Sequence, residues 1–566
     1  MEIMDSIVET MKSELPVAHP HRTLLNEPRI LRIPAFLLSA VLLAVAVMIL
    51  QADVWMNDEE IVGQWASATP GGNWLPAQLW LISKGLCGGA VWAYRVWNVL
   101  ALWFLSWTVF RIATQFQTRS TDLDFAAKQR VAWTAALLVA AHPLAGTSAC
   151  QIGNLGWQLA VLFGLTVVQG FWGFLRQPTA LRMGLLMLWL LLAAVSAPAG
   201  MLLGLGGLWV VWRLATTAER DALGGWFSAK TGWGTGLGIA ALAQVLVLGA
   251  FLQQAWQHRS IAQGGAWTEH WLTQGRVVWQ QLRSFFLPTR LLPEHQFAWS
   301  TQWNDWPAVL ALALVLSTTG WCVWRLSRDR LPQPLRALLL LALWPTVLVF
   351  GWRTTHLLSE VRWYAVLPWV AILMAWGLGW LLQRWPAMQW PLGWGLPMGL
   401  LFLSVDQMTR FSDSREMAAY LLKLEPNQVR VRSYLQEKQV LGGQLAAVLS
   451  SSTPFANAYQ SMQAENAASP FGRRYDLVHT LRWWVMSERR AQSALEQNYG
   501  PEYAQAFAQT STARFIQEVQ ELARTEPAAL PLLAALSSPL PALEPAKPRP
   551  MPSIPGIPAA TADLTH

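Results

Sequence analysis

The sequence is divided by long stretches that contain no charged residue. Residues 33–50 hold none, and residues 183–212 hold none over 30 positions. Roughly 20 apolar residues in a helix cross the ~30 Å hydrocarbon core of a bilayer. Because these stretches are continuously apolar rather than alternating, they favour helices over the strands of a β-barrel. We therefore expect an all-α, polytopic membrane protein.

Composition and charge support the same class. Charged residues make up only 13% of the chain, whereas soluble globular proteins carry about 25%. The net charge is +8, but the Lys and Arg residues lie mainly in short loops, as the positive-inside rule describes for membrane proteins. No nucleic-acid partner is therefore expected. None of the three cysteines falls in a CxxC pair, so neither a metal site nor a disulfide framework is expected.

About eleven spans are expected in all. Residues 74–86 are too short to span and favour an interfacial helix. Pro198 and Gly200 interrupt the stretch 183–212, which predicts two short helices that form a broken hairpin. The expected spans are 33–51, 90–110, 131–148, 157–175, the two helices within 183–212, 234–254, 307–324, 337–352, 364–382 and 388–405.

The distribution of Lys and Arg predicts the topology. It places residues 1–32 in the cytoplasm and residues 33–405 in the membrane, with loop 52–76 and segment 255–304 outside. A bacterial inner membrane fits this arrangement, with the C-terminal part in the periplasm. Residues 406–528 regain charge and helical periodicity, with Asp413 as a plausible N-cap, which predicts a separate α-helical domain. Residues 529–566 are rich in Pro and Ala and are expected to be a disordered tail.

An acidic loop follows the first expected span. Asp53, Asp58, Glu59 and Glu60 occur there, and no Lys or Arg follows before Lys84. The acids are either merely tolerated in an outer loop or they carry chemistry. The 36 tryptophans leave a similar choice, between interfacial belts and aromatic walls that pack on a sugar ring or a lipid chain.

Six local motifs occur in the same order as in a known family. The sequence resembles GT-C-fold membrane glycosyltransferases, specifically the O-mannosyltransferase-like proteins with C-terminal TPR repeats. The motifs that carry the resemblance are "NDEE" (57–60), "RVWNVLALWF" (95–104), "VAAHPLAGTSA" (139–149), "FFLPTRLLPEHQFAWSTQWND" (285–305), "LLSEVRWYAVLPW" (357–369) and "FSDSREMAAYLLKLEPNQVRVRSYL" (411–435).

The resemblance implies transfer of a sugar from a polyprenyl-phosphate-linked donor to a hydroxyl of a protein or surface-glycan acceptor. An acceptor hydroxyl needs a base, and a departing phosphate needs positive charge or a metal. Asp58 and Glu59 are the implied catalytic acids, and Asp58 is also the implied ligand of a divalent cation, Mg or Mn. The implied phosphate-binding residues are Arg290, Arg353, Arg362, His295 and His356, and the supporting residues are Asn98, His142, Glu360 and Tyr364.

The sequence also departs from the family pattern. Thr147, Leu155 and Ala197 stand where the family carries an acid, an Arg and a Lys, and Arg95 stands where it carries a His. Asp305 is one remaining candidate for a second acid. The alternative to an enzyme is therefore a catalytically degenerate membrane scaffold that docks envelope proteins through 406–528. A transporter is a weaker third interpretation, because spans 3, 4, 8 and 10 hold almost no ionisable residues.

Overall fold

The computed structural model describes most of the chain between residues 28 and 424. The described residues are 28–53, 74–88, 90–117, 125–197, 199–229, 267–289, 303–327, 333–351, 363–385 and 392–424, with isolated positions elsewhere. Every regular element among them is a helix, so the expected all-α class is confirmed for this part of the chain. Expected span 234–254, tail 529–566 and most of the domain 406–528 lie outside the described residues.

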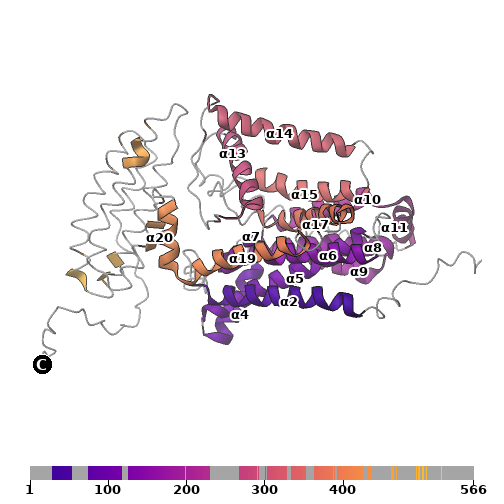
Figure 1. The fold of residues 1–566 in the computed structure, drawn as a ribbon, viewed down its shortest axis with the longest axis horizontal. Helices are drawn as coiled ribbons and strands as arrows, with labels where there is room; N and C mark the ends of the chain where they lie inside the picture. Colours follow the sequence, from indigo (N-terminus) through magenta and orange to yellow (C-terminus); the bar gives the residue numbers. More distant parts are fainter. Residues whose placement is uncertain are drawn as a thin grey trace, which may run out of the picture.

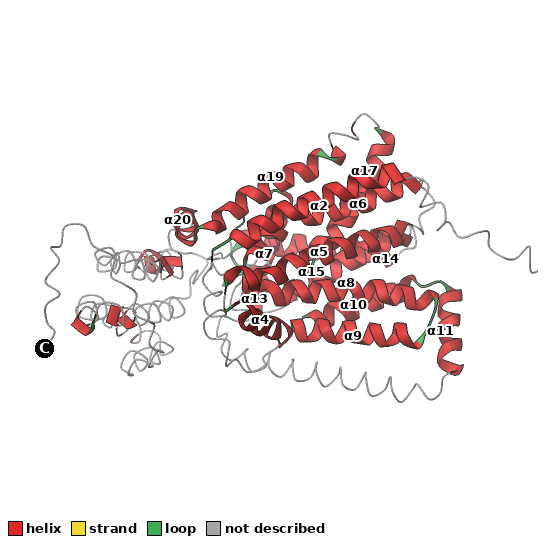
Figure 2. Cartoon of the chain, turned by 90° about the horizontal axis from the view of Figure 1, so that it is seen from below, coloured by secondary structure: helices red, strands yellow, loops and turns green. Residues whose placement is uncertain are grey.

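The helices form a bundle in which most long helices run side by side (Figures 1 and 2). Their bounds are α2 (Pro28–Gln51), α4 (Trp74–Cys87), α5 (Val91–Gln117), α6 (Phe125–Ala141), α7 (Pro143–Cys150), η2 (Ile152–Asn154), α8 (Leu155–Arg176), α9 (Ala180–Ser196), α10 (Gly200–Leu214), α11 (Thr217–Ala229), α13 (Trp267–Phe286), α14 (Trp306–Ser327), α15 (Gln333–Gly351), α17 (Leu367–Arg384), α19 (Gly395–Thr409), η4 (Arg410–Ser412) and α20 (Ser414–Leu424).

The core lies around α5, α6 and α8. Helix α8 packs against α5, α9 and α10, while α6 packs against α5, α17 and α2. The alanines of α6 from Ala135 to Ala141 are all buried. Small side chains let helix backbones approach closely, which is how helices associate where lipid removes the hydrophobic driving force.

The predicted break in 183–212 is confirmed. Helix α9 ends at Ser196 and α10 begins at Gly200, and both helices pack on α8. At Gly200 a Cβ atom would lie 2.0 Å from the carbonyl oxygen of Ala193. Only glycine allows α10 to start this close to the last turn of α9.

The expected span 131–148 is bent at His142. The helix ends at Ala141 and α7 begins at Pro143, with a bend of 44° between them. The cause is local. Pro143 has no N–H to continue the helical hydrogen bonds, and it disfavours a helical backbone at the residue before it. His142 is accordingly extended (ψ 129°). The resulting short helix α7 is buried throughout.

Two described helices, Val91–Phe116 and Ile152–Arg176, are long and apolar enough to cross a membrane, and the number rises to four if each bent helix pair counts as one span. Several others are apolar but shorter, such as Ala180–Ser196 and Leu367–Leu382. The chain is thus compatible with a membrane protein, while the count of about eleven spans stays a prediction. The 14-residue length of α4 agrees with the expectation that 74–86 is too short to span.

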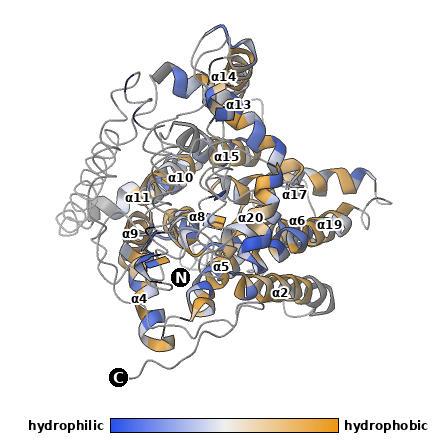
Figure 3. Ribbon diagram, turned by 90° about the vertical axis from the view of Figure 1, so that its left-hand side faces the viewer, coloured by the Kyte–Doolittle hydropathy of each residue, from blue (hydrophilic) through white to orange (hydrophobic). Residues whose placement is uncertain are grey.

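Helix α20 lies beyond one end of the bundle, next to α19, and α11 lies at the opposite end (Figure 1). Figure 3 shows the contrast in hydropathy: α2 is mainly hydrophobic, whereas α20 is largely hydrophilic. The predicted apolar face of α20 is confirmed at Met417 and Leu421, which are buried. Asp413 is its N-cap as predicted, since its Oδ1 accepts hydrogen bonds from the N–H groups of Arg415 and Glu416.

Candidate functional site

Most of the predicted site residues cannot be placed. Asp58, Glu59, Arg290, His295, Arg353, His356, Glu360 and Arg362 lie outside the described residues. Their roles therefore stay predictions. Asn98, His142 and Tyr364 are described. The end of the bundle that carries α7 is called the α7 end below (Figure 2). Asn98 and His142 contact α7 there, and Tyr364 follows Trp363, whose ring lies near that of Phe285, the residue whose carbonyl oxygen binds His142.

Asn98 is fully buried in the second turn of α5. Its Nδ2 donates to the carbonyl oxygens of Ala149 (2.8 Å) and Gln151 (2.9 Å). Ala149 belongs to the last turn of α7, where helical N–H partners run out, and Gln151 is the C-cap residue, whose carbonyl oxygen also accepts from the N–H of Asn154. Asn98 is therefore used to close the C-terminus of α7, and only its buried Oδ1 lacks a partner in the part of the chain that the structure describes.

Arg95 lies one turn before Asn98 and is also fully buried. Its Nε donates to the carbonyl oxygen of Cys150 at 3.2 Å, Nη1 donates to that of Ala52, and Nη2 donates to that of Asp53. The guanidinium thus binds backbone oxygens at the C-terminal ends of two helices, α7 and α2. A positive charge at this place complements both helix dipoles.

Asp53 continues the same set of contacts toward α20. Its N–H donates to the carbonyl oxygen of Phe411, and its Oδ2 accepts a hydrogen bond from the N–H of Ser414 at 3.1 Å. Ser414 is the first residue of α20, so its N–H has no partner within that helix. Asp53 and Asp413 together satisfy the first three N–H groups of α20.

His142 is held by the backbone on both sides of its ring. Its Nδ1 accepts a hydrogen bond from the N–H of Leu144 at 3.1 Å, so it N-caps α7. Nε2 lies 3.0 Å from the carbonyl oxygen of Phe285, and since a carbonyl can only accept, Nε2 is the donor. With both nitrogens engaged, His142 acts as a helix-terminus residue rather than as a ligand.

Tyr364 is fully buried in the turn that precedes α17. Its hydroxyl has no hydrogen-bond partner among the described residues. The adjacent Trp363 donates its Nε1–H to the Oε1 of Gln281 on α13. The side chain of Trp363 therefore attaches this turn to α13.

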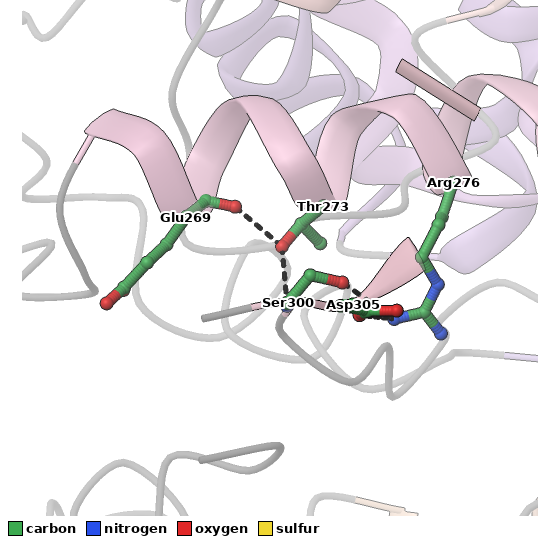
Figure 4. A network of polar contacts seen from close by, with 5 residues as sticks. All are labelled: Glu269, Thr273, Arg276, Ser300 and Asp305. Carbon is green, nitrogen blue, oxygen red and sulfur yellow. Dashed lines mark hydrogen bonds and ion pairs between the residues drawn. The ribbon is translucent and has the colours of Figure 1, made fainter. Parts of the chain in front are cut away.

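A polar network joins α13 to the segment before α14 (Figure 4). The Thr273 hydroxyl donates to the carbonyl oxygen of Glu269 (2.7 Å) and accepts from the N–H of Ser300 (2.9 Å). Arg276 donates to the Ser300 hydroxyl at 2.9 Å and lies 3.8 Å from the Asp305 carboxylate. Asp305, a candidate second acid from the sequence, is thus paired with a cation here.

The ends of three separate segments that carry predicted site residues come together at the α7 end. Asp53 precedes residues 54–73 and contacts Phe411. Thr289 precedes Arg290, and its carbonyl oxygen accepts from the Nε2 of Gln407 at 3.0 Å. Trp363 follows Arg362, and its ring centroid lies 6.5 Å from that of Phe285, whose carbonyl oxygen binds His142.

Among the described residues, no group of three or more His, Cys, Asp or Glu side chains is placed to hold a metal ion. Asp58, the expected ligand of a divalent cation, is not among them.

Comparison of the chain with protein-family models, curated proteins and solved structures finds no match. The resemblance to the GT-C glycosyltransferases therefore stays an expectation that rests on the six motifs.

Two residues that matter at the α7 end were missed from the sequence. Arg95 appeared only as a departure from the family motif, and Asp53 appeared less important than Asp58 and Glu59. One signal could have indicated Arg95: it is the only charged residue between Lys84 and Arg111. A lone charge in an apolar helix must find buried partners.

Proposed function

We propose that this chain is an integral membrane glycosyltransferase. It transfers a sugar from a polyprenyl-phosphate-linked donor to a hydroxyl of a protein or surface-glycan acceptor. The proposed setting is a bacterial inner membrane, with the N-terminus in the cytoplasm and the site and C-terminal domain on the periplasmic side. The spans, the acidic loop and the six ordered motifs support this proposal.

The observation that carries the proposal is the convergence at the α7 end. Asp53 is five positions before Asp58, Thr289 immediately precedes Arg290, and Trp363 immediately follows Arg362. A chain extends at most about 3.6 Å per residue, so Asp58 lies within about 18 Å of Asp53, and the two arginines lie next to described residues. The described residues nearest in the chain to Asp58, Arg290 and Arg362 thus lie at the same end of the bundle.

In the proposed reaction, Asp58 or Glu59 accepts the proton of the acceptor hydroxyl as its oxygen attacks the anomeric carbon of the sugar. The bond from that carbon to the donor phosphate oxygen breaks, and the phosphate leaves with the electron pair. Arg290, Arg353 and Arg362 bind the released negative charge, because guanidinium groups match phosphate oxygens in a fork.

The test is the paired substitution Asp58→Asn and Glu59→Gln in the full-length protein. At least one is expected to abolish glycosylation of the native acceptor while protein abundance stays unchanged. Asp406→Asn is the matched control: Asp406 is an exposed carboxylate on α19, paired with Arg410 at 2.8 Å, and its loss should leave glycosylation intact. Unchanged glycan in both loop variants would refute the catalytic role.

One observation favours the second candidate, a membrane scaffold that docks envelope proteins through 406–528. The described polar side chains at the α7 end, such as Asn98 and His142, bind backbone groups rather than facing an open site. A scaffold predicts normal glycosylation in both loop variants, together with loss of a binding partner when surface residues of the C-terminal domain are changed.

A reporter fused after residue 405 tests the topology. A periplasmic reporter signal agrees with the proposed orientation, whereas a cytoplasmic signal contradicts it.

A further inference from the structure

The N-terminus of helix α20 is capped by a residue from a distant part of the sequence. The N–H of Ser414 donates to Asp53, which is 361 positions earlier in the chain. Helix N-caps are normally supplied by the residue just before the helix, and α20 has such a cap in Asp413. The Asp53 carboxylate therefore adds a contact that a local cap does not require.

The backbone of Asp53 is fixed as well as its side chain. Its N–H donates to the carbonyl oxygen of Phe411, and its own carbonyl oxygen accepts from Arg95. Arg95 in turn binds the carbonyl oxygen of Cys150 in α7. One buried guanidinium and one aspartate thus connect the ends of α2 and α7 with α5 and the first turn of α20.

Asp53 also occupies a special place in the sequence, because residues 54–73 follow it directly and include Asp58 and Glu59. Any shift of α20 against the bundle must move Asp53, or break its two hydrogen bonds to Phe411 and Ser414. A displacement of Asp53 moves the point from which the acidic loop leaves the bundle.

We infer that Asp53 and Arg95 form a positioning joint that sets the acidic loop and α20 relative to each other, so that the C-terminal domain controls the placement of Asp58 and Glu59. The inference rests on the proposed function in one respect: the catalytic role of Asp58 and Glu59. Neither residue needs to touch a substrate. Linkage makes such a coupling reciprocal: whatever holds α20 in place also favours one position of the loop.

Hydrogen–deuterium exchange of the full-length protein in detergent tests the joint without an activity assay. Asp53→Ala should speed exchange about fivefold in the first turn of α20, the factor expected for loss of a helix cap. Exchange in peptides from 54–60 should rise in the same variant, and α8 (Leu155–Arg176) should not change. Asp53→Asn keeps an oxygen that can accept from Ser414 and should restore the wild-type pattern in both segments.

Arg95→Lys provides the second variant. It keeps the charge but loses the fork that reaches three carbonyls, so exchange should again rise in α20 and in 54–60 together. Combined with Asp53→Ala it should add little further, because both changes break the same joint. Asp406→Ala is the control and should change neither segment.

Three results would overturn the inference. The first is faster exchange in α20 with no change in 54–60, which would mean that Asp53 caps α20 but does not position the acidic loop. The second is equal exchange in Asp53→Ala and wild type. The third is a rise throughout α8 that Asp53→Asn fails to reverse, which would make Asp53 a general stability residue. Asp58→Asn should not alter exchange in α20, so failure of the catalytic proposal is distinguishable from failure of the joint.

Discussion

Two regions of the bundle hold their helices together by different means. In the α8–α9–α10 region the interior contacts are mainly close and apolar, as at Gly204 of α10, which faces Leu190 of α9 and Val167 of α8, although Arg182 of α9 also donates to the carbonyl oxygen of Gly173 near the end of α8. At the α7 end, side chains such as Arg95, Asn98 and His142 bind free carbonyl and N–H groups at helix ends. The first region depends on volume and tolerates any side chain that fits. The second depends on hydrogen-bond donors and acceptors in fixed places. The segments that contain the proposed site residues are joined to this region.

The largest effect is expected from Arg95→Met. Methionine fills part of the volume but leaves the carbonyl oxygens of Ala52, Asp53 and Cys150 without their donor. Each buried acceptor left unsatisfied costs roughly 1–3 kcal/mol, so the free energy of unfolding should fall by about 3 kcal/mol or more. Thermal unfolding in detergent measures this change. A midpoint equal to that of the wild type would contradict the account of the α7 end.

Gly200→Ala tests the other region. The added Cβ would lie 2.0 Å from the carbonyl oxygen of Ala193 and 2.9 Å from the Cβ of Ala160. The helix must shift, which should lower the free energy of unfolding by about 1–3 kcal/mol.

Gly184→Ala is the matched control for Gly200→Ala. Gly184 is inside α9, and a Cβ there meets nothing within 4 Å. Because alanine favours the helix over glycine by roughly 0.5–1 kcal/mol, this variant should be slightly more stable than the wild type. Equal destabilisation by both substitutions would show that close approach at Gly200 is not the cause.

His142→Ala should remove the N-cap of α7 and the tether to Phe285, with a loss of about 2 kcal/mol in the free energy of unfolding. His142→Asn keeps an oxygen that can cap the helix but does not reach Phe285, so it should recover about half of the loss. Chemical denaturation of the three proteins measures the series. If Asn and Ala behave alike, the cap contributes nothing.

The smallest effect is expected from Asp305→Asn. The Arg276 side chain is 33% exposed and the Asp305 side chain only 9%, but the Arg276 Nη1 lies 3.8 Å from the Asp305 Oδ2, beyond hydrogen-bond distance. Partly exposed pairs of this kind contribute less than about 1 kcal/mol, and Arg276 keeps its hydrogen bond to Ser300. The melting temperature should therefore change by no more than a few degrees. A large loss of stability would assign Asp305 a role beyond this network.

Local signals in the sequence were sufficient for part of the fold. Pro198 and Gly200 predicted the break between α9 and α10, and Asp413 predicted the start of α20, because each effect acts within a few residues. The expected span 131–148 runs past Pro143, where α6 has already ended, because the apolar run is long enough to span. A long apolar run does not show where the backbone bends within it.

The roles of the polar residues depend on distant partners and could not be predicted in the same way. The family resemblance implied supporting roles for Asn98 and His142, and their observed partners are backbone groups of Ala149, Gln151, Leu144 and Phe285. Arg95 binds Ala52 and Cys150, which are 43 and 55 positions away. Side-chain types indicate which groups can form hydrogen bonds, whereas only the packing of the helices decides which carbonyl oxygens lie within reach.

The account's central claim is that the acidic loop and the arginines share one site at the α7 end, and a cysteine cross-link tests it most directly. In Asp58→Cys/Arg362→Cys a short thiol cross-linker should join the two introduced cysteines. In Asp58→Cys/Arg384→Cys it should not, because Arg384 ends α17, about 27 Å along the helix from its start. Each single-cysteine variant shows the background from the three native cysteines. Efficient cross-linking to position 362 and none to position 384 is the predicted result. No cross-link to position 362, or equal yields at both positions, would contradict a shared site.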